Sequence, residues 1–267
     1  FGVMLVVSLA FMVPYVMIVT GKPITDPVSM ALFRELFFHQ VNPSLFVIFP
    51  LVALQLLMLQ IFNKFGPGVF WKIVRGTYYH PKTETRIFMF LDLNSSTTIA
   101  EQLGNEQYHD LLKEYFADIT NSILDHGGEI YQYLGDGIIV NWTAHGDHRD
   151  LNCLRCFFDM QKEIGTRRDK YLEKFGLVPT FKAGLHSGEV VVGEIGIIKR
   201  DITYSGDVLN TTARIQGMCH ELKSDLLVSN DFIKSVSLPK PFVATAAGDF
   251  RLKGKEREVE LYLLSMN

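Results

Sequence analysis

Two aspartates in separate strand-like segments are the residues of this chain best suited to metal chemistry. Asp92 lies near the end of an apolar run, residues 86 to 93, and Asp136 lies in the turn of a predicted hairpin, residues 129 to 142. If these segments are neighbouring strands, the hairpin brings Asp136 beside Asp92. Two adjacent carboxylates repel each other, and a hard divalent cation such as magnesium relieves that repulsion through oxygen ligands. The pair therefore predicts a metal site.

Each aspartate taken alone has a simpler explanation. Asp92 could cap the helix that begins near Ser95, and Asp136 could occupy a turn position that suits its backbone. The three neighbouring strands, which bring the two carboxylates together, favour a shared metal site over these two separate roles.

Small polar residues follow Asp92 at the expected start of a helix. Ser95, Ser96 and Thr97 stand where the first amide hydrogens of a helix are free, and such amides bind anions with the help of the helix dipole. Helix capping alone would also explain the hydroxyls. The adjoining metal site favours the terminal phosphates of a nucleotide.

A second pair of polar residues lies in a predicted helix from 207 to 218. Asn210 and Arg214 are four residues apart and therefore share one face of that helix. Arginine suits a charged phosphorus transition state, because its planar fork meets several oxygens and keeps its charge at any working pH. An ordinary surface arginine is the alternative when this helix is considered alone.

Hydrophobic periodicity predicts an α+β domain. A chain of 267 residues, 48% of them hydrophobic, has room for one substantial domain and an appendage. The predicted strands cover 86–93, the hairpin 129–142, 180–186, 189–195 and 258–264, with a tight hairpin at Ser187-Gly188, and the predicted helices cover 97–103, 105–125, 147–174 and 207–218.

Charge and cysteine content exclude some classes of protein. The net charge is −3 and no basic stripe interleaved with aromatic residues is present, so we expect no nucleic-acid partner. Three cysteines suit a reducing compartment and build no disulfide framework.

Two uncharged stretches, residues 1–21 and 40–63, precede the predicted domain. At about 1.5 Å per residue, a helix of about 20 residues spans a hydrocarbon core about 30 Å thick, so each stretch predicts a transmembrane helix rather than a buried core helix. Five Lys and Arg residues lie between 63 and 86, against two between 21 and 43. The positive-inside rule then places the following domain in the cytoplasm.

The predicted organisation has three parts. Residues 1–62 form a membrane segment, 63–84 a cytoplasmic connector and 85–267 the catalytic domain of a multi-pass protein in the cell membrane. Because the chain opens inside an apolar stretch, we expect a longer protein with further spans upstream.

Five motifs together resemble one family. The sequence is similar to the class III nucleotidyl cyclases, and the resemblance extends in order across the whole domain. It is carried by Phe90-Leu91-Asp92-Leu93 with Ser96-Thr97, Leu134-Gly135-Asp136-Gly137, Gly184-Leu185-His186-Ser187-Gly188, Gly206-Asp207-Val208-Leu209-Asn210-Thr211-Thr212-Ala213-Arg214 and Leu252-Lys253-Gly254-Lys255.

The resemblance implies a ferredoxin-like βαββαβ core that works as a head-to-tail homodimer with shared active sites. It implies that Asp92, Asp136 and the backbone carbonyl of Leu93 hold two magnesium or manganese ions in each site. The reaction it implies is metal-assisted attack of the ribose 3'-hydroxyl on the α-phosphorus of a nucleoside triphosphate.

The same resemblance assigns three residues to the partner chain. Asn210 orients the ribose, Arg214 stabilises the reacting phosphate, and Lys253 meets the outgoing pyrophosphate. Neither site of the dimer would then work in a monomer.

Gln132 and Thr203 stand where the resemblance places the residues that read the purine. Thr203 fits the bacterial adenylyl pattern, whereas Gln132 replaces the lysine of adenylyl cyclases. Both side chains can donate or accept a hydrogen bond, so their chemistry leaves ATP and GTP open. We predict a membrane-bound adenylyl cyclase that makes cyclic AMP, with a guanylyl cyclase as the alternative.

Two other classes were weighed against the cyclase. A catalytically silent cyclase-like module that binds nucleotide and transmits a signal would be free to lose the aspartates, Asn210 or Arg214, and all of them are present. A diguanylate-forming enzyme would carry a Gly-Gly-acidic-acidic-Phe signature, of which Gly127-Gly128-Glu129-Ile130 is only a partial match.

Overall fold

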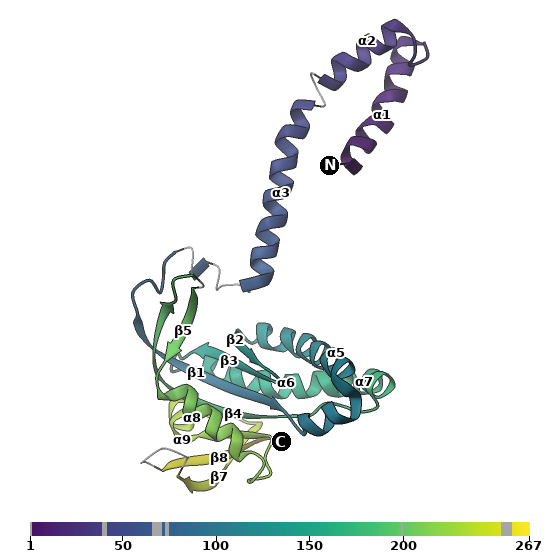
Figure 1. Ribbon diagram of the computed structural model, residues 1–267. Helices are drawn as coiled ribbons and strands as arrows, with labels where there is room; N and C mark the ends of the chain where they lie inside the picture. Colours follow the sequence, from purple (N-terminus) through teal and green to yellow (C-terminus); the bar gives the residue numbers. More distant parts are fainter. Residues whose placement is uncertain (1, 39–41, 66–70, 73–74, 199, 252–257) are drawn as a thin grey trace. The chain divides into compact units, whose positions relative to one another are not determined.

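The computed structural model describes residues 2–38, 42–65, 71–72, 75–198, 200–251 and 258–267 (Figure 1). The chain divides into two compact units, Phe1–Arg75 and Gly76–Asn267. The first unit is helical and contains α1 (Gly2–Thr20), α2 (Pro27–Leu36) and α3 (Asn42–Phe65). Asp26 caps α2, because its side chain accepts a hydrogen bond from the amide of Val28 at 3.0 Å. The predicted division into 1–62, 63–84 and 85–267 stays a prediction.

The predicted transmembrane helices are not supported by the structure. Within the described ranges of the chain, no helix is both long enough and apolar enough to cross a membrane. The prediction of two transmembrane helices, and with it that of a multi-pass protein in the cell membrane with a cytoplasmic domain, is therefore wrong. The prediction relied on missing charges alone. In the second stretch, Gln55 and Gln60 carry amides that are costly to place in lipid.

The second unit contains all the strands that the structure describes and the helices that pack on them. The strands are β1 (Lys82–Leu93), β2 (Glu129–Leu134), β3 (Gly137–Thr143), β4 (Phe181–Ile195), β5 (Asp201–Ser205), β6 (Leu226–Ser229), β7 (Phe242–Phe250) and β8 (Val259–Met266). The helices are α5 (Ser96–Asp125), the 3₁₀ helix His148–Leu151, α6 (Asn152–Thr166), α7 (Arg168–Phe175), α8 (Asp207–Met218) and α9 (Asn230–Ser235).

The strands form one mixed sheet in the order β2-β3-β1-β4-β6-β8-β7, with β5 paired to β4 (Figure 1). β1 is antiparallel to both β3 and β4, whereas β4 and β6 are parallel. From β1 to β4 the elements follow the predicted βαββαβ order, with the second helix divided into α6 and α7. The predicted α+β class is therefore confirmed.

β1 separates two environments, because successive side chains of a strand point to opposite faces of the sheet. Ile87, Met89 and Leu91 lie in the main hydrophobic core together with residues of α5 and α6. Phe88 lies in a second cluster, which includes residues of β4, β5 and α8. Asp92 is an even number of positions from Phe88, so it shares this second face.

β4 runs without a break through the motif in which a hairpin was predicted. Ser187 and Gly188 pair with Ile87 and Arg86 of β1, so the predicted hairpin at Ser187-Gly188 is wrong. The glycines of this motif serve packing instead. A Cβ at Gly184 would lie 2.3 Å from the backbone nitrogen of Gln216 in α8. Glycine therefore lets α8 lie directly on the strand.

We expect Gly184→Ala to destabilise the second unit by about 1–3 kcal/mol, the usual cost of overpacking. The added methyl would meet backbone atoms of α8, which cannot rotate away. Urea titration of the full chain measures the free energy of unfolding. Gly165→Ala is the control, because no atom lies within 4 Å of its added Cβ, and better helix propensity should stabilise that variant by up to about 1 kcal/mol. Equal stability of Gly184→Ala and wild type would contradict the close packing.

The predicted helices 97–103 and 105–125 meet at Gly104, where α5 is kinked and φ is 74°. The predicted helix 147–174, in contrast, divides into the 3₁₀ helix, α6 and α7, with a non-helical Arg167 between the last two. Apolar periodicity continues across these later breaks and so did not reveal them.

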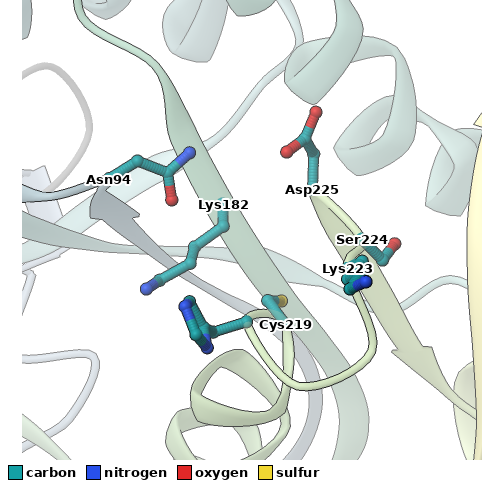
Figure 2. A pocket seen from close by; sticks show the side chains of 7 residues that line it. Asn94, Lys182, Cys219, Lys223, Ser224 and Asp225 are labelled. Atoms are coloured by element: carbon teal, nitrogen blue, oxygen red, sulfur yellow. The ribbon is translucent and has the colours of Figure 1, made fainter.

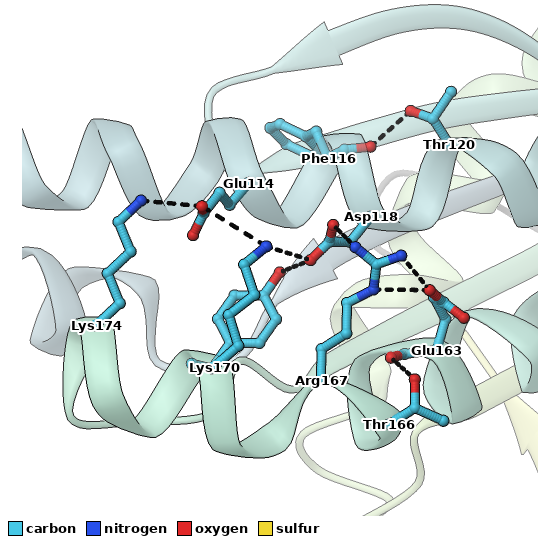
Figure 3. A network of polar contacts seen from close by, with 10 residues as sticks. Glu114, Phe116, Asp118, Thr120, Glu163, Thr166, Arg167, Lys170 and Lys174 are labelled. Atoms are coloured by element: carbon cyan, nitrogen blue, oxygen red, sulfur yellow. Dashed lines mark hydrogen bonds and ion pairs between the residues drawn. The ribbon is translucent and has the colours of Figure 1, made fainter.

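Charged residues fasten α5 to α6 and α7 (Figure 3). Asp118 of α5 is buried and accepts hydrogen bonds from Arg167 and from the hydroxyl of Tyr171, the latter at 2.8 Å. Arg167 also donates to Glu163 of α6 at 2.7 Å. A buried carboxylate needs such partners to offset its lost hydration. The network holds these helices together over the main hydrophobic core, on the side of the sheet to which Ile87, Met89 and Leu91 point.

Candidate active site

The acidic pair lies where β1 ends and β3 begins. Asp92 pairs in the sheet with Gly137 of β3 on one side and with Lys182 of β4 on the other. Asp136 occupies the turn between β2 and β3, and the preceding Gly135 has φ 62°, a value that glycine adopts without strain. The structure thus brings the two aspartates together as the sequence predicted.

The carboxyl group of Asp136 lies close enough to that of Asp92 for its charge to act on Asp92. The pKa of Asp92 is raised above its ordinary value, first by partial burial and then by the negative charge of Asp136. Lys182 and Gln216 act in the opposite direction. Lys182 Nζ lies 3.8 Å from Asp92 Oδ2, and Gln216 Nε2 donates to the same oxygen at 3.2 Å. One lysine for two carboxylates leaves negative charge that a divalent cation would neutralise.

The raised pKa of Asp92 predicts a pH dependence of stability. Between the ordinary pKa of aspartate, about 4, and the raised value, the folded protein binds more protons than the unfolded chain, so its stability falls as pH rises through this window. We expect the unfolding free energy of wild type, measured in urea with a metal chelator, to fall relative to that of Asp92→Asn as pH increases. Magnesium should reduce this shift. A difference that stays constant with pH would contradict the prediction.

Three residues of this site were not identified from the sequence. Lys182 lies two residues before the motif that begins at Gly184. Its pairing with Asp92 in the sheet could have identified Lys182 as a site residue. Gln216 gives no local signal, since it is 124 residues from Asp92 in the chain. Tyr108 of α5 has a pKa raised first by burial and then by the charge of Asp136, whereas the side chain of Ser96 acts in the opposite direction.

A cavity of about 320 Å³ lies beside Lys182 (Figure 2). Asn94, Lys182, Lys223 and Asp225 are among the residues that line it. Lys182 also forms the ion pair with Asp92, so the cavity and the acidic pair share this lysine. The lining carries charges of both signs.

The predicted phosphate-binding residues lie at the start of α5. Ser96 and Thr97 belong to its first turn, and Ser95 precedes it in a left-handed conformation with φ 56°, which is uncommon for a residue other than glycine. The side chain of Ser95 makes no capping hydrogen bond. Capping therefore does not explain Ser95, whose side chain leaves the first amide hydrogens of the helix free for an anion.

Asn210 and Arg214 lie on the side of α8 that points away from its own sheet. The buried residues of α8 are Val208, Thr211, Thr212 and Ile215, whereas Asn210 is exposed. Within the described part of this chain, neither Asn210 nor Arg214 forms a hydrogen bond or ion pair with the two aspartates. The Nη1 atom of Arg214 is buried without a hydrogen-bond partner among the described residues.

Gln132 and Thr203 lie on different strands, β2 and β5. No hydrogen bond joins the two side chains in the ranges that the structure describes, and the hydroxyl of Thr203 donates to the carbonyl of Gly193 at 3.3 Å. Their neighbours do meet, because the rings of Tyr131 and Tyr204 have centroids 5.0 Å apart. The structure therefore brings the residues next to the two predicted base-reading residues into contact, although β2 pairs with β3 and β5 with β4.

The described residues fit an oxygen-only metal site with two protein carboxylates. They contain no group of three or more His, Cys, Asp or Glu side chains that could hold a metal ion. Gly137 has no side chain to crowd Asp92. A Cβ on Gly137 would lie 3.5 Å from Asp92 Oδ1 and 3.0 Å from the carbonyl oxygen of Leu91. Carbonyl, water and phosphate oxygens suit the remaining positions around a hard cation. Lys253 lies outside the described residues.

Residues 78–266 match the Adenylate and Guanylate cyclase catalytic domain family. The chain belongs to this family. The predicted class III cyclase domain is thereby confirmed. Adenylate cyclase 2 of Rhizobium meliloti (strain 1021) is 34% identical over 208 residues, which are 78% of this chain and 57% of that protein. The chain therefore spans little more than half the length of this relative.

Solved structures share the fold of the cyclase domain. A bacterial light-regulated adenylyl cyclase has a TM-score of 0.69 at 23% identity, with 84% of this chain and 65% of that chain covered. The adenylyl cyclase CyaB from P. aeruginosa has a TM-score of 0.62 at 21% identity, with 70% of this chain and 97% of that chain covered. At these identities the likeness establishes the fold alone.

Proposed function

We propose that this cyclase domain converts ATP to 3',5'-cyclic AMP and pyrophosphate. The observation that carries the proposal is the position of Asp92 opposite Gly137 at the turn that holds Asp136, beside the uncapped start of α5. In the reaction the ribose 3'-oxygen forms a bond to the α-phosphorus, and the bond from that phosphorus to the bridging oxygen breaks. Pyrophosphate leaves, and the hydroxyl proton passes to water.

Asp92, Asp136 and the backbone carbonyl of Leu93 are the groups that hold divalent ions in this proposal, two magnesium or manganese ions in each active site. Such ions, when bound, neutralise the triphosphate and lower the pKa of the ribose 3'-hydroxyl. The protein contributes rigidity, because Asp92 is fixed in β1 and Asp136 in a two-residue turn. Ligands held in place by the fold need little reorganisation during the reaction. No side chain is required as a base.

The start of α5 binds the terminal phosphates in this proposal. Ser95, Ser96 and Thr97 present free amide hydrogens and hydroxyls, and the helix dipole adds a partial positive charge. Lys182 contributes a full positive charge on the same side of the site, 3.8 Å from Asp92. Together they orient the leaving pyrophosphate away from the ribose.

Asn210 and Arg214 act in the active site of a second copy of the chain. Their position on the outer face of α8, where Asn210 is exposed, supports this assignment. The planar guanidinium of Arg214 can pair with several phosphate oxygens across an interface. Asn210 orients the ribose, Arg214 stabilises the charge on the reacting phosphate, and Lys253 meets the pyrophosphate. The result is a head-to-tail homodimer with two shared sites.

ATP is the proposed substrate rather than GTP. The name of the Rhizobium meliloti relative, an adenylate cyclase 34% identical to this chain, supports ATP, and Thr203 is compatible with it. Gln132 can serve either purine. The test is product analysis of the full chain with ATP and GTP in parallel, with magnesium or manganese. Cyclic AMP as the main product supports the proposal, whereas a clear preference for GTP overturns the substrate. Nucleotide binding without either product would favour the silent module.

A further inference from the structure

A buried charge lies in β1, on the face that carries Asp92. Arg86 is only 2% exposed. Its guanidinium donates to Glu84 Oε2 at 2.7 and 2.9 Å, to Asn141 Oδ1 at 2.9 Å and to the hydroxyl of Tyr78 at 3.0 Å. A guanidinium with this many fixed acceptors is held in one position. The proposed reaction does not use it.

The partners of Arg86 fasten the beginning of β2 to its neighbours. Arg86 Nη1 lies 3.4 Å from a carboxylate oxygen of Glu129, the first residue of β2. Asn141 of β3 donates to the backbone carbonyl of the same Glu129 at 3.2 Å. Between Ile130 and Gln132 the pairing of β2 with β3 shifts register, so the backbone ladder is interrupted just before Gln132. Side-chain contacts at Glu129 therefore help to fix this part of the strand.

Tyr204 connects the same guanidinium to β5. The guanidinium carbon of Arg86 lies 5.5 Å from the centroid of the Tyr204 ring, within the range of a cation–π contact. Burial raises the pKa of the Tyr204 hydroxyl, whereas the charge of Arg86 and the side chain of Asn141 act in the opposite direction, and the ring meets that of Tyr131 edge-on. Tyr204 follows Thr203 in the chain, and Tyr131 precedes Gln132. Both predicted base-reading residues are thus direct neighbours of this cluster.

We propose that Arg86 is a positioning residue for the nucleotide base. By holding Glu129, Asn141 and Tyr204 together, it sets the separation and orientation of β2 and β5, and so of Gln132 and Thr203. The assignment of those two residues to the purine rests on the proposed function. A buried ion cluster gives little net stability compared with apolar side chains of similar volume, but it does impose one geometry. That property suits a role in base selection.

The test compares Arg86→Lys with wild type in the full chain. Lysine keeps the charge but cannot reach three partners at once, because it lacks the planar fork. Fluorescent analogues of ATP and GTP report binding without turnover, and initial rates report KM and kcat for each nucleotide. We expect the affinity for the ATP analogue and the KM to change by roughly tenfold, with kcat at saturation changed much less, because misplacing a bound substrate costs affinity and alignment. The preference between the two bases should shrink.

Two further variants separate positioning from general stability. Tyr204→Phe keeps the ring over the guanidinium and removes only the hydroxyl, on which both Arg86 and Asn141 act, so it should change base preference in the same direction and by less. Asp118→Asn is the matched control, since Asp118 is 6% exposed and paired with Arg167, but it lies in the helical network. It should lower the urea midpoint and leave affinity and base preference unchanged.

Each outcome decides the proposal. Folded Arg86→Lys with wild-type affinity and base preference overturns it, and if Arg86→Lys does not fold, an unchanged preference in Tyr204→Phe overturns it. A wild type that binds nucleotide but makes no cyclic product defeats the proposed activity, while the analogue affinities still decide the role of Arg86. A wild type that binds neither analogue defeats both.

Discussion

Asp92→Ala is expected to lower kcat at least about 10³-fold, because about 4 kcal/mol of transition-state stabilisation depends on the ions that this carboxylate holds. The protein should remain folded. Asp92 is only partly buried, and its charge is opposed by that of Asp136, which also raises its pKa. Removing it ends one repulsion inside the site. Lys182 and Gln216 lose a partner, but Lys182 lines an open cavity and remains hydrated.

The measurement combines turnover with metal binding. Manganese titration of the full chain should show weaker binding in Asp92→Ala and in the isosteric Asp92→Asn, and circular dichroism should show an intact fold. Asp225→Asn is the matched control, because this carboxylate lines the neighbouring cavity without facing Asp136. It should keep wild-type turnover. An Asp92→Ala enzyme with kcat within tenfold of wild type would remove the acidic pair from the mechanism.

Arg214→Ala is expected to lower kcat by about 10³-fold or more, the size of effect that an arginine has on phosphoryl-transfer transition states. The fold should be unaffected, because the substitution also removes the buried Nη1 that has no partner among the described residues. Arg155→Ala is the control, since Arg155 is an exposed arginine whose hydrogen bond goes to Asn152 of its own helix. Measuring both turnover and nucleotide affinity distinguishes a loss in kcat from a loss in nucleotide binding.

The two inactive variants should restore activity when mixed. In the proposed dimer each site takes its aspartates from one chain and Arg214 from the other, so a heterodimer of Asp92→Ala and Arg214→Ala has one intact site. With random pairing at equal concentrations, about a quarter of wild-type activity should return, since half of the dimers are mixed and each has one of two sites. If all catalytic residues came from one chain, the mixture would stay inactive.

Local patterns were sufficient for the elements around the metal site. The apolar run that contains Asp92, the glycines around Asp136 and the four-residue spacing of Asn210 and Arg214 each depend on residues near one another in the chain. The structure accordingly contains the strand, the hairpin turn and the helix that those patterns predicted. The catalytic roles of these residues, and those of Gln132, Thr203 and Lys253, stay predictions.

Local patterns misled where a residue type serves more than one purpose. Gly188 after Ser187 is typical of a tight turn, but in β4 the glycines of this motif leave room for α8. Absence of charge suggested transmembrane helices, yet no described helix is long and apolar enough for one. Arg86 counted only as one of the basic residues between 63 and 86, whereas it is buried among acidic and aromatic partners.

The sequence by itself determined the family, through the five motifs that resemble it, and the α+β class and the proximity of Asp92 to Asp136, which follow from short-range periodicity and turn chemistry. Only the tertiary structure decided that Lys182 and Gln216 flank Asp92, and that Arg86 joins β1 to β2, β3 and β5. Those contacts join segments tens to more than a hundred residues apart. They depend on strand register and helix packing, which are properties of the whole sheet and leave no mark on the residues next to them in the chain.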